Sequence, residues 1–178
     1  MTNAQRRRFE VTPGKSAVLI EARSNVGPIA FGTTGVQGAL VVSMEDGAID
    51  LEGAAPEACL SIELLSFSSG NSVYDAELRR RIGAKLHPTT TLALQNVSRI
   101  GRTDRYQVEG DLAFHGLTRR ISGTVGVEIG DGGELTVVGE HVFDIRDFDV
   151  DSPSLLMLRI YPDVRVELQL YATPIPAT

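Results

Sequence analysis

The chain has 178 residues, of which 42% are hydrophobic and 22% are charged, and its formal net charge is −6. This length and composition predict one domain over residues 1–178, and the acidic balance argues against a nucleic-acid partner, which needs clustered lysine and arginine. No apolar run approaches the roughly 20 residues of a membrane span, and residues 1–20 contain no apolar stretch of the roughly 7–15 residues found in signal peptides. We therefore expect a cytoplasmic protein without a membrane span.

Apolar and polar residues alternate with a period of two along much of the chain, which indicates β-strands that bury one face. Eight segments show this pattern: residues 16–22, 36–44, 60–64, 92–94, 106–114, 121–127, 135–143 and 164–170. Short turn-forming sequences join several of them, such as EDG at 45–47 and HG at 115–116. Neighbouring strands are therefore expected to pair antiparallel.

One segment, near residues 73–85, has the pattern of an amphipathic helix instead. Its apolar stripe repeats every fourth residue and consists of Tyr74, Leu78, Ile82 and Leu86. Asn71 or Ser72 suits the N-cap, and His87-Pro88 is expected to end the helix. A single helix among many strands suggests that it covers one end of a closed sheet, since closure removes exposed strand edges.

We therefore predict an all-β fold, an antiparallel and roughly eight-stranded closed barrel with one α-helix, with a β-sandwich as the alternative. A barrel of this size is filled by its own side chains or holds one small ligand. Glycine occurs in the inward rows at Gly38, Gly110, Gly123 and Gly139, and the chain has no tryptophan. Two interpretations stay open: the glycines mark bends of the sheet, or the missing side chains leave an apolar tunnel.

Three segments carry a resemblance to a known family. VEGDLAFHGLTRRISGTV at 108–125, VFDIRDFDVD at 142–151 and PDVRVELQLYA at 162–172 resemble the YceI-like family of lipid-binding barrels. The resemblance extends from about Phe9 to Ala172. It implies a lipocalin-like barrel whose apolar tunnel holds a long isoprenoid chain, such as a quinone tail or a polyprenyl phosphate.

On this basis we expect the barrel to bind a long apolar ligand of the isoprenoid class, as a carrier or storage protein. The alternative is a filled barrel that serves as a structural or protein-interaction module. The expected ligand-binding residues are Val18, Ile20, Leu40, Leu60, Ile62, Leu92, Leu94, Val108, Leu112, Phe114, Arg119, Val125, His141, Phe143 and Met157. Arg119 is either a solvated charge at the rim of the barrel or a contact to a phosphate or carbonyl at the tunnel mouth. His141 is either a core histidine bonded to a neighbour or a contact to the ligand head group.

Motifs for catalysis do not occur in the sequence. It contains no nucleophile elbow, phosphate-binding glycine loop or dinucleotide fingerprint, so we expect neither an enzyme nor a cofactor. His87, His115 and His141 are far apart in the chain, and no metal site is expected. Cys59 is the one cysteine and is expected to be a buried thiol without a disulfide. A homodimer is left open.

Overall fold

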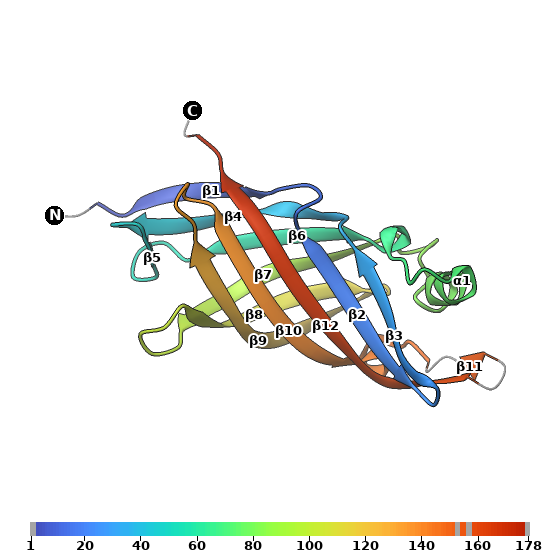
Figure 1. The fold of residues 1–178 in the computed structure, drawn as a ribbon. Helices are drawn as coiled ribbons and strands as arrows, with labels where there is room; N and C mark the ends of the chain where they lie inside the picture. The colour runs from blue at the N-terminus through green and yellow to red at the C-terminus, as the bar shows by residue number, and fades with distance from the viewer. Residues whose placement is uncertain (1–2, 152–153, 156–157, 177–178) are drawn as a thin grey trace.

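The computed structural model describes residues 3–151, 154–155 and 158–176. Eight antiparallel strands close into a barrel in the order β1-β4-β6-β7-β8-β9-β10-β12, because β12 pairs back onto β1. These strands are β1 (Gln5–Val11), β4 (Val36–Glu45), β6 (Glu57–Glu63), β7 (Thr89–Arg99), β8 (Arg105–Phe114), β9 (Leu117–Ile129), β10 (Leu135–Asp144) and β12 (Leu158–Pro174). The predicted all-β barrel is confirmed (Figure 1).

Four further strands extend the barrel wall. The hairpin of β2 (Ala17–Ser24) and β3 (Gly27–Thr33) pairs with the first part of β12, whereas β1 pairs with the last residues of that strand. The short strands β5 (Ala48–Asp50) and β11 (Ser154–Leu155) pair with β4 and β12. The long strand β12 therefore has two successive neighbours on one side, β2 and then β1.

The eighth strand of the ring is β1, which was not predicted from the sequence. The segment at 16–22 was expected to belong to the ring, but it forms β2, which extends the sheet beyond β12. In β1 only the end of QRRRFEV alternates, because its first four residues are all exposed and only Phe9 and Val11 are buried. Two inward side chains are too few for a period of two to be recognised.

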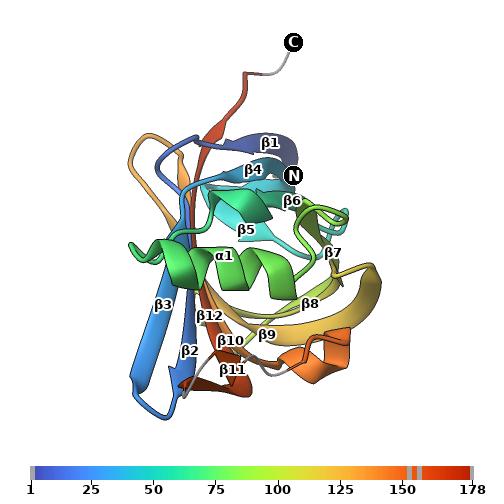
Figure 2. The ribbon, with the colours of Figure 1, turned by 90° about the vertical axis from the view of Figure 1, so that its right-hand side faces the viewer.

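The helix α1 (Ser72–Arg81) crosses one end of the barrel, as the view in Figure 2 shows. Asn71 is the N-cap, and its side-chain oxygen accepts hydrogen bonds from the backbone N–H groups of Val73 (3.0 Å) and Tyr74 (3.3 Å). The helix ends before the predicted His87-Pro88, because Gly83 adopts a left-handed conformation (φ +62°). Leu86, expected on the apolar stripe, lies beyond this turn and is 83% exposed.

The best-packed part of the core lies along the seam where the ring closes. Phe9 on β1, Leu135 on β10 and Leu170 on β12 are each at most 2% exposed. Cys59, by contrast, is exposed and not buried as expected. The exposure of Cys59 follows from the alternation of side chains along β6, since the next residue, Leu60, is the one that points inward. Within the described residues, no helix has the length and apolar character needed to cross a bilayer.

A glycine is required at position 38, because β4 and β6 approach each other closely there. Its φ is +148°, and a Cβ there would overlap the carbonyl oxygen of Cys59 and lie 3.0 Å from the Cα of Leu60 on the adjacent strand. Gly38 therefore supports the interpretation in which strand glycines mark bends.

The other three inward glycines differ in the space beside them. A Cβ would lie 3.0 Å from a carbonyl oxygen of β7 at Gly110, and 2.9 Å from a valine methyl of β9 at Gly139. At Gly123 the nearest atoms, including Nδ1 of His141, would be 3.8 Å away, which is ordinary contact. Of the four, Gly123 is the position where a missing side chain leaves room in the interior.

Replacing Gly38 by alanine is expected to lower the free energy of unfolding by about 2 kcal/mol or more, because the backbone conformation and the backbone of β6 both oppose a Cβ. Gly126→Ala on β9 is the matched control, since a Cβ there meets nothing within 4 Å. It should change stability by less than about 1 kcal/mol. Urea unfolding of both variants measures the difference, and equal effects would contradict this account of Gly38.

Candidate functional site

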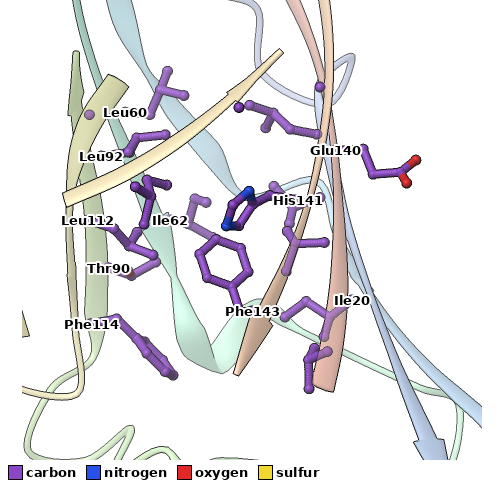
Figure 3. A pocket seen from close by; sticks show the side chains of 18 of the residues that line it. Ile20, Leu60, Ile62, Thr90, Leu92, Leu112, Phe114, Glu140, His141 and Phe143 are labelled. Atoms are coloured by element: carbon purple, nitrogen blue, oxygen red, sulfur yellow. The ribbon is translucent and has the colours of Figure 1, made fainter. Parts of the chain in front are cut away.

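The interior of the barrel contains a cavity of about 410 Å³. Side chains from the ring strands, from β2 and β3 and from α1 line it, and most of them are aliphatic or aromatic. Figure 3 shows these side chains converging from opposite walls. The barrel is therefore not filled by its own residues, and the apolar lining makes this space the candidate binding site.

All but two of the residues expected from the sequence line this cavity. They are Val18, Ile20, Leu40, Leu60, Ile62, Leu92, Leu94, Val108, Leu112, Phe114, Val125, His141 and Phe143. They come together because each lies in the inward row of its strand. Their contact with a ligand stays a prediction.

Arg119 and Met157 are the two exceptions. Arg119 is exposed and does not line the cavity. Its Nε instead donates a hydrogen bond to the backbone oxygen of Asp147 (3.1 Å), in the 3-10 helix η2 (Ile145–Phe148). This contact holds the guanidinium beside η2, at one end of the barrel and outside the cavity. Met157 lies outside the described residues.

Sequence reasoning missed part of the lining. Ile29 and Phe31 on β3 are buried and face the cavity, as do Leu158 and Ile160 on β12, which are half-buried. The alternation in GPIAFGT was the available signal on β3, but the segment is short and contains Pro28, which disfavours a strand assignment.

The helix end of the cavity contains a cluster of paired charges, one carboxylate and two guanidinium groups. Glu77 on α1 accepts hydrogen bonds from Nε of Arg81 (2.6 Å) and from the guanidinium of Arg80 (2.9 Å). The hydrogen bond from Arg81 is the main reason that the pKa of Glu77 is lowered from its ordinary value. Glu77 and Arg81 both line the cavity beside Tyr74 and Leu78. The ion pair lets α1 cover the apolar space without leaving an unpaired charge there.

Asp75 ties the start of α1 to the barrel. Its carboxylate is buried and accepts hydrogen bonds from the backbone N–H of Ser69 (2.8 Å), from the Ser69 hydroxyl (2.6 Å) and from the Ser68 hydroxyl (3.3 Å). Ser68 in turn exchanges two backbone hydrogen bonds with Gly32 of β3. The pKa of Asp75 is lowered, chiefly by the hydrogen bond from the Ser69 side chain.

An aromatic cluster packs against η2 at the same end of the barrel. The ring of Phe148 is 5.5 Å from that of Phe114 and 6.4 Å from that of Phe143, both in edge contact. Nδ1 of His115 donates a hydrogen bond to the backbone oxygen of Phe148 (2.8 Å), and the His87 ring lies 6.0 Å from the His115 ring. Two of the three histidines, His87 and His115, therefore pack at this end of the barrel and outside the cavity.

His141 is separate from this pair and faces the cavity. Its ring contacts Phe143 edge-on at 4.5 Å between centroids, and Figure 3 shows it among the apolar side chains. Over the described ranges, no cluster of three or more His, Cys, Asp or Glu side chains is arranged to hold a metal ion.

Comparisons with known proteins agree on the fold. The pattern of the YceI-like domain matches residues 9–172. BcnA of Burkholderia cenocepacia superposes with a TM-score of 0.76 at 21% identity, covering 92% of this chain and 99% of that chain. A polyisoprenoid-binding domain from Saccharophagus degradans, implicated in plant cell wall breakdown, superposes with a TM-score of 0.73 at 14% identity, covering 94% and 98%.

A third similar structure is the YceI protein of Campylobacter jejuni, with a TM-score of 0.56 and 16% identity over 74% of this chain and 75% of that chain. At these identities the structural likeness establishes the fold alone. No curated protein sequence matches the chain.

The buried Asp75 carboxylate should make the free energy of unfolding depend on pH. Because its folded pKa lies below the ordinary value of 3.8, its stabilisation is present above that value and is lost as the pH falls through the folded pKa. Asp75→Asn should therefore be less stable than the wild type at pH 7, and the gap should narrow at pH 3. Urea unfolding at both pH values tests this.

Glu128→Gln is the control for this experiment, since Glu128 is exposed and its side chain makes no hydrogen bond within the described part of the chain. It should follow the wild-type pH dependence. A gap between wild type and Asp75→Asn that stays constant from pH 7 to pH 3 would show that the carboxylate charge does not stabilise the start of α1.

Proposed function

This chain belongs to the YceI-like domain family, and from that premise we propose that its barrel binds the chain of an isoprenoid lipid in the 410 Å³ cavity. The observation that carries the proposal is the cavity itself, a space inside a closed sheet whose walls are almost wholly apolar. A water molecule has few hydrogen-bonding partners in such a space, whereas a hydrocarbon chain buries its apolar surface there.

The volume of the cavity sets the length of chain that it encloses. A volume of about 410 Å³ lies within the range of ligand pockets, about 300–1,000 Å³, so the space admits a hydrocarbon segment of the size of a small ligand. Burial contributes about 0.8 kcal/mol per methylene group. Ten buried groups would contribute about 8 kcal/mol before the cost of ordering the chain is subtracted, which is the free energy that corresponds to micromolar affinity.

The isoprenoid class is supported by the solved relatives. The Saccharophagus degradans domain, described as polyisoprenoid-binding, has the same fold over 94% of this chain. The cavity here suits that kind of ligand, because a branched hydrocarbon chain fits between the branched side chains of Ile20, Ile62 and Val125.

We propose carriage or storage of the lipid, and not a reaction on it. Aliphatic and aromatic side chains surround the space, and the ion pair at its helix end is internally neutralised. We place this activity in the cytoplasm, in a chain that acts alone or as a homodimer, with no nucleic-acid partner.

Filling the cavity should abolish uptake. Leu112→Trp places a bulky ring in the cavity from β8 and should weaken the binding of farnesol, a three-unit prenyl alcohol, by about tenfold or more, because the ring occupies ligand space. Val142→Trp is the matched control, since Val142 is on the outer face of β10 and 56% exposed. Its affinity should stay within about twofold of wild type. Competition against a fluorescent fatty acid measures both.

The chain has no tryptophan of its own, so each variant also carries a unique fluorophore. The indole introduced in Leu112→Trp is expected to emit as a buried ring, and the indole introduced in Val142→Trp as a ring in water, which checks the two placements. Saturable farnesol binding that is equally strong in both variants would contradict a binding site inside the barrel. No binding to the wild type would contradict the proposed ligand class.

A further inference from the structure

His141 presents a polar ring to the cavity from the strand wall. It lies on β10 next to Glu140, whose carboxylate points away from the cavity in Figure 3 and pairs with Arg165 (2.8 Å). The imidazole projects inward and has no hydrogen bond to any residue in the described part of the chain. Its ring contact is with the edge of Phe143, at an interplanar angle of 66°. The alternation of the strand thus places one hydrogen-bonding group among apolar side chains.

Other polar side chains around the cavity have partners. The Thr90 hydroxyl donates to the backbone oxygen of Ala113 (2.6 Å), and the Tyr106 hydroxyl accepts from Arg99 (3.0 Å). The carboxylate on α1 is held by two arginines, as described above. Tyr74 presents its ring from the helix and not from the barrel wall. Among the large polar side chains that the described strands point inward, His141 is therefore the one whose hydrogen-bonding capacity the protein leaves unused.

No side chain from the neighbouring strand covers the imidazole at this point. Gly123 on β9 faces the ring, and a Cβ at that position would lie in ordinary contact with Nδ1, at 3.8 Å. Burying a polar ring without a hydrogen bond costs free energy, and a ligand atom that makes the bond recovers it.

We propose that the His141 imidazole hydrogen-bonds a single neutral oxygen of the bound lipid, so that the hydroxyl or carbonyl end of the ligand lies inside the barrel. This inference rests on the proposed function and narrows its ligand class to neutral oxygenated isoprenoids. A neutral head group suits the lining around the imidazole, which is aliphatic and aromatic. Arg81, the one lysine or arginine among the described lining residues, lies on α1 and is already hydrogen-bonded to Glu77. An anionic group held at the strand wall would therefore have no guanidinium partner there.

Two ligands and two variants test the proposal. The ligands are farnesol and farnesene, which share the same carbon skeleton; farnesene lacks the hydroxyl group and has one more double bond. His141→Leu should weaken farnesol binding by about three- to tenfold, the loss expected for one hydrogen bond, and should leave farnesene binding unchanged or tighter. His141→Gln, which keeps a hydrogen-bonding group, should retain farnesol affinity within about threefold. Farnesene binding also shows that the leucine variant is folded.

The outcomes separate this inference from the proposed function. If wild type binds farnesene and farnesol but His141→Leu affects both equally or neither, the cavity binds hydrocarbon and the histidine contact is wrong. If wild type binds neither farnesol nor farnesene, the proposed function itself is contradicted. Tighter binding of farnesoic acid than of farnesol to wild type would overturn the neutral head group.

A spectroscopic measurement gives an independent readout. The chain has three histidines, so the His141 imidazole nitrogen signals can be assigned by their loss in the leucine variant. Farnesol should shift the His141 signals and farnesene should not, while those of His87 and His115 stay in place with both ligands. Signals of His141 that do not respond to farnesol would overturn the proposal.

Discussion

The pairing of β12 with β1 is the constraint on which the rest of the structure depends. Because Phe9 pairs with Pro174, the two ends of the chain close the ring, and every inward side chain faces a shared interior. Before it reaches β1, β12 pairs with β2, which extends the wall toward α1. Closure with eight strands sets the width of that interior, and the side chains present decide how much of it is filled.

The cavity depends on which positions of the inner wall lack a large side chain and on whether that lack leaves free space. At Gly38 the backbone of the neighbouring strand lies too close for a Cβ, and at Gly110 and Gly139 a Cβ would press on atoms of the neighbouring strands, so these three positions add no space. The space comes from medium-sized aliphatic side chains that do not meet across the barrel, and beside His141 from Gly123. The helix end is covered by α1, whose cavity-lining charges Glu77 and Arg81 are paired with each other, and the imidazole is the polar group that the strand wall presents.

Local patterns were enough to predict most of the architecture. Alternation identified the strands that form β4 and β8 to β10, and HG at 115–116 predicted the two-residue hairpin in which His115 and Gly116 both adopt positive φ. The pattern also placed the inward residues correctly, because the face of a side chain in a strand follows from its own position. It did not find β1, where only Phe9 and Val11 carry the signal, nor the early end of α1 at Gly83.

The sequence by itself determined most of the strand identities, the inward rows of those strands and the apolar character of the interior, since these depend on neighbours two to four residues away. Tertiary structure alone decided that β1 completes the ring, that Arg119 bonds the backbone of Asp147, and that the interior holds an empty volume. Each of these depends on distances between segments far apart in the chain. A periodicity contains no information about such distances, because it records only which face a residue occupies and not what lies opposite.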